Sequence, residues 1–98
     1  MARIELAAAI GADFERILDH LFRYDARNPA SRLEELVESI DILKRSPMIG
    51  HPLPSGLREL IIGRGSRGYV ALYRYVPESD VVFVLAIRSQ PEAGYSRE

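Results

Sequence analysis

Residues 69–87 read YVALYRYV-PESD-VVFVLAI, and this segment decides the fold. Tyr69–Val76 and Val81–Ile87 are rich in β-branched and aromatic side chains, which favour strands. Pro77–Asp80 between them has proline at an early position of a turn. Because so short a connection joins antiparallel strands, the segment predicts a hairpin. Val81–Ile87 is apolar on both faces, so it is expected inside the sheet rather than at its edge.

Upstream of this hairpin, Leu57–Ile62 predicts another strand, which gives a three-stranded antiparallel meander. The connection to Tyr69 reads GRGSRG over Gly63–Gly68, which matches the G-x-G-x-x-G pattern and the first half of a P-loop. Both phosphate-binding motifs need a helix directly after the glycines. Here a strand follows, so we interpret the segment as a flexible loop that presents Arg64 and Arg67.

The first half of the chain predicts one strand and two helices. Arg3–Ala8 alternates between apolar and polar residues, as a half-buried strand does. A helix is predicted next, because apolar residues recur at helical spacing: Ile10, Phe14, Ile17, Leu18 and Leu21. The solvent side of this helix is expected to bear Asp13, Arg16, Asp19 and Arg23. A second apolar stripe follows Asn28-Pro29, which supply an N-cap and a first helical residue, and comprises Leu33, Leu36, Val37, Ile40 and Leu43.

Pro47 is expected to end the second helix, and the proline- and glycine-rich segment Ser46–Gly56 is predicted to be a loop. The short connection between the helices favours an antiparallel helix hairpin. The order of elements therefore predicts a single α+β domain over residues 1–98, with the N-terminal strand, the helix hairpin packed on one face of the sheet, and the meander.

Composition excludes several classes of protein. The 98 residues are 47% hydrophobic and 28% charged, which is typical of a globular domain rather than a disordered one. The absence of cysteine rules out disulfides and thiolate metal sites. The longest apolar stretch is far shorter than a membrane-spanning helix requires, and the N-terminus does not resemble a signal peptide. We expect a cytoplasmic protein that has no membrane partner.

Charge is distributed unevenly although the net charge is only −1. Between Leu57 and Val76 the chain carries one acidic residue, Glu59, and the four arginines Arg58, Arg64, Arg67 and Arg74. Guanidinium groups can bind carboxylate or phosphate through two parallel hydrogen bonds. We therefore interpret these four arginines as a candidate surface for an anionic partner, with a solvated sheet face as the alternative.

Other candidate sites are weak. His20 and His51 lie on different elements without further ligands, so no metal is expected. Ser66, His51 and Asp80 supply the residue types of a hydrolase triad but lack a nucleophile elbow. We interpret Glu34, Glu35 and Glu38 as a solvated helix face. Alternation places Tyr69, Tyr73 and Tyr75 on one face of a strand. They are interpreted as half core and half rim, with a surface for stacking on bases as the less favoured alternative.

The order and spacing of several segments resemble the RelE/ParE toxin superfamily of type II toxin–antitoxin modules. The resemblance covers nearly the whole chain. Its segments are LKRSP at 43–47, MIGHPL at 48–53, LREL at 57–60, the Gly68-Tyr69 pair, LYRY at 72–75, VFVLAIR at 82–88 and EAGY at 92–95. The resemblance implies the α+β fold, no cofactor, and a cognate antitoxin whose disordered segment folds onto this domain, in a toxin–antitoxin hetero-oligomer.

The family contains two mechanisms. RelE-like members cut mRNA on the ribosome with basic residues and often a C-terminal tyrosine, whereas ParE-like members inhibit DNA gyrase. If the chain is RelE-like, the resemblance implies a catalytic site made of Arg58, Arg64, Arg88 and Tyr95. If it is ParE-like, it has no catalytic chemistry of its own.

Two departures favour the ParE-like interpretation. RelE-like members carry an arginine after the Gly-Tyr pair, where this chain has Val70, and a basic residue before the final Glu-x-x-Tyr, where it has Pro91. Because the loss of one preorganised charge partner typically costs about 3 kcal/mol of barrier, the loss of two predicts a poor nuclease. The alternatives are a ribosome-dependent mRNA endonuclease and a degenerate, non-toxic member that still binds an antitoxin.

Overall fold

The computed structural model describes residues 1–24, 29–63 and 68–89. Its elements are the five strands β1 (Arg3–Leu6), β2 (His51–Pro52), β3 (Arg58–Ile62), β4 (Tyr69–Val76) and β5 (Val81–Ser89), the helices α1 (Ile10–Tyr24) and α2 (Pro29–Asp41), and the 3-10 turns η1 (Ile42–Lys44) and η2 (Pro54–Gly56). This confirms the predicted α+β fold with an N-terminal strand, two helices and a mostly antiparallel sheet.

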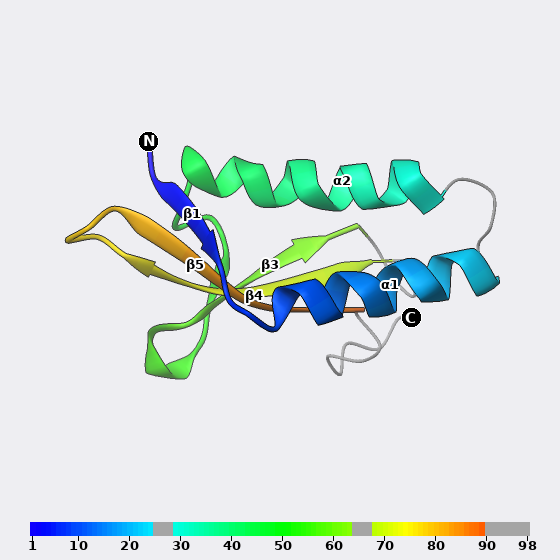
Figure 1. Cartoon of the computed structure of the whole chain (residues 1–98). Helices are drawn as coiled ribbons and strands as arrows, with labels where there is room; N and C mark the ends of the chain where they lie inside the picture. Colours follow the sequence, from blue (N-terminus) through cyan, green and yellow to red (C-terminus); the bar gives the residue numbers. More distant parts are fainter. Residues whose placement is uncertain (25–28, 64–67, 90–98) are drawn as a thin grey trace.

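The described strands form one sheet in the order β1-β5-β4-β3-β2 (Figure 1). All neighbours are antiparallel except β1 and β5, which are parallel. β5 therefore lies inside the sheet, between β1 and β4, as its apolar sequence predicts. The meander gains a short strand, β2, that was expected to be part of a loop.

One irregularity interrupts the pairing of the two longest strands. Leu72 lies opposite Ala86, and Tyr73 lies opposite Val84, so Leu85 is an extra residue on β5. Such a bulge increases the local twist of a sheet. The connecting turn of the same hairpin is closed by a hydrogen bond of 3.2 Å from the Asp80 N–H to the Pro77 carbonyl oxygen.

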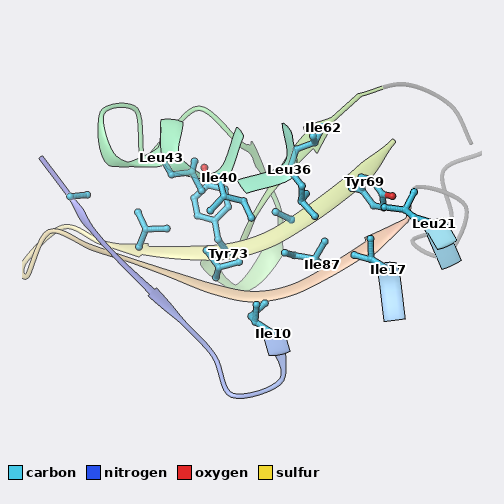
Figure 2. Packing of buried hydrophobic residues seen from close by; sticks show 14 residues of the cluster. Ile10, Ile17, Leu21, Leu36, Ile40, Leu43, Ile62, Tyr69, Tyr73 and Ile87 are labelled. Carbon is cyan, nitrogen blue, oxygen red and sulfur yellow. The ribbon is translucent and has the colours of Figure 1, made fainter. Parts of the chain in front are cut away.

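Both helices contribute their apolar sides to one hydrophobic cluster with the sheet. The two helices run in opposite directions (Figure 1), and Figure 2 shows their side chains meeting those of the long strands. The buried members are Ala2, Ile10, Ile17, Leu21, Leu36, Ile40, Leu43, Ile62, Tyr69, Ala71, Tyr73, Val82, Val84 and Ile87. We call the side of the sheet that faces this cluster the core face.

The predicted start of the second helix is correct, but the predicted end is not. α2 begins at Pro29, where a missing N–H costs nothing. It ends at Asp41, and the chain tightens into η1 (Ile42–Lys44), so the helix stops before Pro47 rather than at it. Within residues 1–24, 29–63 and 68–89, none of the helices is both long and apolar enough to cross a membrane.

Candidate functional site

A buried carboxylate on α1 holds the C-terminal end of β5. Asp13 is only 4% exposed. Its Oδ2 accepts the backbone N–H of Ile87 at 2.9 Å, and its Oδ1 accepts from Arg16 Nη1 at 2.9 Å and from Arg88 Nη1 at 3.0 Å. Arg16 Nη2 also donates to the Ile87 carbonyl oxygen at 2.9 Å. We call Asp13, Arg16, Ile87 and Arg88 the Asp13 clamp.

Opposing effects set the pKa of Asp13. Burial raises the pKa of this carboxyl, but the hydrogen bonds from Arg16 and from the Ile87 N–H, together with the charge of Arg88, lower it below the usual 3.8. Asp13 is therefore ionised at neutral pH. It neutralises part of the charge of Arg88, whose side chain remains 47% exposed.

A second cluster ties the segment before β2 to the core face. The buried hydroxyl of Tyr73 accepts the Gly50 N–H at 2.8 Å. Arg58 Nη1 donates to the carbonyl oxygens of Gly50 at 2.8 Å and Met48 at 3.0 Å. Burial raises the pKa of the Tyr73 hydroxyl, although the Gly50 N–H and the charge of Arg58 act in the opposite direction. We call Met48, Gly50, Arg58 and Tyr73 the Gly50 cluster.

The structure does not bring Arg58 and Arg88 together. Arg58 lies opposite Tyr73 on β4, and Tyr73 in turn lies opposite Val84 on β5. Arg88 lies opposite Val70, several positions further along the sheet. Because opposed residues share a face, Arg58 belongs to the core face and Arg88 to the other one.

The remaining predicted site residues divide into two groups. Arg74 is exposed, and its Nη2 donates to the Ser55 carbonyl oxygen at 3.3 Å. Arg64, Arg67, Tyr95 and Pro91 lie outside the described residues, so their interpretation rests on the sequence. Gly63 ends the described part of the loop with a φ of 78°, and a strand follows, as expected.

The weaker candidates behave as ordinary structural residues. His20, His51 and the three glutamates of α2 (Glu34, Glu35 and Glu38) are exposed, and the described residues hold no cluster of metal-ligand side chains. Asp80 accepts a hydrogen bond of 2.7 Å from the Tyr75 hydroxyl, which raises the pKa of Tyr75. Tyr69 and Tyr73 belong to the core, so they are not exposed for base stacking. Ser66 lies outside the described residues.

The prediction that Asp13 lies on the solvent side of its helix was wrong. Asp13 follows Ile10 by three positions and precedes Ile17 by four, so helical spacing places it within the apolar stripe. A charged residue inside such a stripe indicates a buried partner, and this signal was available in the sequence. The identity of the partners was not, because Ile87 and Arg88 are distant in the chain.

A comparison with models of known protein families identifies the family of this chain. A family model described as "ParE toxin of type II toxin-antitoxin system, parDE" matches residues 4–94. The chain belongs to this ParE toxin family. A comparison of this ParE toxin with curated proteins found no match.

Solved structures of toxins from the wider superfamily share the fold of this ParE toxin. A chain of the chromosomal ParDE system from P. aeruginosa has a TM-score of 0.71 and 20% identity, covering 91% of this chain and 96% of that one. A chain of the E. coli RelBE toxin–antitoxin complex has a TM-score of 0.65 and 17% identity, with the same coverage. A mutant form of the E. coli toxin RelE in the free state has a TM-score of 0.67 and 17% identity, covering 97% of this chain and 90% of that one.

In this ParE toxin the position after the Gly68-Tyr69 pair is closed to solvent. Val70 is 4% exposed and lies between Ile61 on β3 and Arg88 on β5. An arginine at position 70 would bury a cation directly opposite Arg88. The structure thus accommodates valine at a position where RelE-like members are expected to carry a cation.

Val70→Arg is expected to lower the free energy of unfolding by at least about 2 kcal/mol, because a buried charge without a partner is costly. Ile61→Arg is the matched control, since Ile61 lies opposite Val70 on the same face but is 45% exposed. We expect that control to change stability by only about 0.5 kcal/mol. Urea unfolding followed by circular dichroism measures both, and equal midpoints for the two variants would contradict the prediction.

Proposed function

We propose that this ParE toxin inhibits DNA gyrase by binding it, without catalytic chemistry of its own, and that a cognate antitoxin neutralises it. The observation that carries the proposal is the set of hydrogen bonds made by Arg58 and Arg88, the two described arginines of the expected nuclease site. Arg88 is hydrogen-bonded to the buried Asp13, and Arg58 is hydrogen-bonded to two backbone carbonyl groups. Both guanidinium groups therefore stabilise the fold.

RNA cleavage requires cations that converge on the phosphate whose charge develops in the transition state. Arg58 and Arg88 lie on different faces of the sheet, and Val70 contributes an apolar side chain at a third position. These features weigh against the RelE-like alternative with its site of Arg58, Arg64, Arg88 and Tyr95. They leave binding to a protein target as the favoured mode of action.

The antitoxin partner is supported by the relatives. The similar chains from P. aeruginosa and E. coli come from toxin–antitoxin systems, and the RelBE structure is a toxin–antitoxin complex. We propose the same kind of hetero-oligomer here, formed in the cytoplasm. Acidic antitoxin side chains are expected at Arg64, Arg67, Arg74 and the exposed part of Arg58.

A gyrase supercoiling assay tests the proposed target. We expect the purified toxin to inhibit the supercoiling of relaxed plasmid, and an equimolar amount of antitoxin to restore it, because the antitoxin holds the toxin by coupled folding and binding. The same preparation is added to a translation mixture, in which the mRNA is expected to stay intact. Gyrase reactions with antitoxin alone serve as the control.

Each contrary result identifies a different alternative. Cleavage of mRNA at the ribosomal A site would establish the RelE-like alternative and overturn the proposal. Neither activity, together with tight antitoxin binding, would identify a non-toxic family member and would also overturn it.

A further inference from the structure

We propose that gyrase contacts the face of the sheet opposite the core face, on an apolar strip that β4 and β5 present there. The strip comprises Leu72, Phe83, Leu85 and Ala86, and we call it the outer strip. The inference rests on the proposed function in one respect, namely that DNA gyrase is the target. It adds the surface of the toxin that gyrase contacts and the chemistry of the gyrase surface that fits it.

The strand register places the outer strip on one face of the sheet. Leu72 and Arg74 are the neighbours of Tyr73, whose side chain belongs to the core face, so both point to the other side. Leu72 lies opposite Ala86, and Arg74 lies opposite Phe83. Because opposed residues share a face, Phe83 and Ala86 also point outward.

The bulge in β5 turns a further apolar side chain toward the same face. Val84 and Ile87 both belong to the buried cluster, although they are three positions apart. In a regular strand, residues an odd number of positions apart point to opposite faces. Leu85, the extra residue, therefore joins Ala86 on the outer side, and Ile87 returns to the core. Bulges re-aim side chains next to functional sites, and here the bulge adds a leucine to the outer strip.

The outer strip is apolar surface that the core does not use. All four side chains are half-buried, and none of them belongs to the buried cluster of the described residues or packs against it. Leu60 and Tyr75, on the core face, do pack against that cluster. An antiparallel sheet that faces only water on one side carries polar residues there. Apolar residues at these outward positions therefore indicate a surface that a partner covers.

Positive charge lies at the two ends of the outer strip. Arg74 on β4 and Arg88 on β5 are both exposed. Arg88 lies opposite Val70, which precedes Arg74 by four positions, so the two arginines are about 13 Å apart along the strand direction. A complementary surface is therefore apolar at its centre and carries acidic side chains about 13 Å apart at its ends.

Acidic residues lie at the sides of the outer strip instead. Glu5 on β1 lies opposite Phe83, and Glu59 on β3 lies opposite Leu72. Glu5 Oε2 is already paired with Arg3 Nε at 2.9 Å, and Glu59 is half-buried. This separation of charge gives the strip a direction, because acidic groups of a partner are attracted to its ends and repelled from its sides.

A protein surface fits this face better than a nucleic acid does. RelE-like members are expected to carry a cation at position 70, and Val70 lies on the same face, two positions before Leu72. Phosphate groups bind through cations, whereas the centre of this face offers apolar side chains. A protein can bury the outer strip and pair its acidic side chains with Arg74 and the exposed part of Arg88.

Arg74 also belongs to the arginines that we propose for the antitoxin. Gyrase and the antitoxin cannot occupy this side chain at the same time. A shared arginine at one end of the outer strip would therefore let the antitoxin exclude gyrase while it binds mainly elsewhere on the toxin.

Binding to purified gyrase holoenzyme tests the inference. Leu85→Asp is expected to weaken binding at least about tenfold, because it places a charge in the apolar contact. Leu85→Ala only removes apolar area and should weaken binding about fivefold. The matched control is Phe22→Asp, because Phe22 is apolar and 61% exposed but lies on α1. This control should leave the affinity for gyrase unchanged.

A second pair of variants tests the charge at the end of the strip. Arg74→Glu is expected to weaken gyrase binding about tenfold in low salt and to make the affinity less dependent on salt, because it removes an attraction to acidic side chains. Arg23→Glu makes the same change in net charge on α1, where the arginine is 66% exposed. Equal effects of these two variants would contradict the predicted charge of the gyrase surface and overturn that part of the inference.

Antitoxin binding and oligomeric state identify the other occupants of the strip. The protein encoded by the gene next to that of the toxin is expected to bind Leu85→Asp and the unmodified chain with affinities within about twofold. Equal losses of gyrase and antitoxin binding in a variant that circular dichroism shows to be folded would assign the strip to the antitoxin and overturn the inference. A toxin dimer that Leu85→Asp dissociates would assign it to a second copy, with the same consequence. If Leu85→Asp does not fold, Leu85→Ala decides each comparison.

The results separate this surface from the proposed function. Gyrase binding that the Leu85 variants weaken, without inhibition of supercoiling, would overturn the proposed mode of action and leave the surface intact. Inhibition of supercoiling that both Leu85 variants retain in full would overturn the surface and leave the proposed function intact. A toxin that does not bind gyrase at all would overturn both.

Discussion

Asp13→Ala is expected to lower the free energy of unfolding by about 3 kcal/mol. The substitution leaves the Ile87 N–H without its acceptor and leaves Arg16 and Arg88 without their shared carboxylate. A buried amide without a partner costs about 1–3 kcal/mol. The two arginine side chains, 41% and 47% exposed, recover part of their hydration, which keeps the loss near the lower end of the range for broken buried ion pairs.

The contribution of Asp13 also depends on pH. Because the pKa of this carboxyl is lower in the folded protein than its usual 3.8, protonation favours the unfolded chain. The stabilisation is therefore complete at neutral pH and decreases as the pH falls through the folded-state pKa. The difference in stability between the unmodified chain and Asp13→Ala is expected to narrow in acid.

Asp19→Ala provides the control on the same helix. Asp19 Oδ2 lies 3.6 Å from Arg23 Nε, and both side chains are 66% exposed. Exposed pairs of this kind contribute less than about 1 kcal/mol. Urea unfolding at several pH values measures both variants. If Asp13→Ala and Asp19→Ala lost the same stability, the buried carboxylate would not have the role that its geometry indicates.

Gly50→Ala is expected to lower the free energy of unfolding by about 2–3 kcal/mol, because the site has no space for a methyl group. A Cβ at position 50 would lie 2.5 Å from Tyr73 Oη, 2.6 Å from Tyr73 Cε1 and 2.9 Å from the Glu59 carbonyl oxygen. Tyr73 is completely buried, and Glu59 is paired with His51 in the sheet. Neither neighbour can move away without disturbing the core or the strand pairing.

Gly11→Ala is the matched glycine control. Gly11 lies in α1, and a Cβ there would meet nothing within 4 Å. Alanine favours helix over glycine by up to about 1 kcal/mol, so this variant should be as stable as the unmodified chain or more so. Thermal unfolding of both glycine variants makes the comparison, and a Gly50→Ala protein as stable as Gly11→Ala would refute the steric argument.

Sequence patterns predicted most of the fold because each helix buries one side and the two long strands are rich in β-branched and aromatic residues. These patterns lie within short stretches of sequence: apolar residues recur at helical spacing in α1 and α2, and core residues occupy alternate positions along β4. β2 carried no such signal, because it has only two residues and one of them is Pro52. It exists because the Gly50 cluster holds the preceding segment against β4, which is a tertiary effect.

The candidate site was predictable in its residue types but not in its contacts. Local charge and the family resemblance both identified Arg58, and the resemblance identified Arg88. Their partners are the carbonyl groups of Met48 and Gly50 in one case and Asp13 in the other. A sequence shows that an arginine is present, whereas only the assembled sheet shows that its charge is already engaged within the protein.

The parallel pairing of β1 with β5 sets the order in which the newly made chain can fold. Arg3 lies opposite Val81, and the Asp13 carboxylate binds an amide that is 74 positions away. Such distant contacts form only after a long loop has closed, which slows folding. During synthesis, β1 has no strand to pair with, and the Asp13 carboxylate lacks its backbone partner, until β5 has left the ribosome. The toxin therefore completes its sheet only after β5 has been synthesised, and any binding partner that is synthesised earlier is already present at that moment.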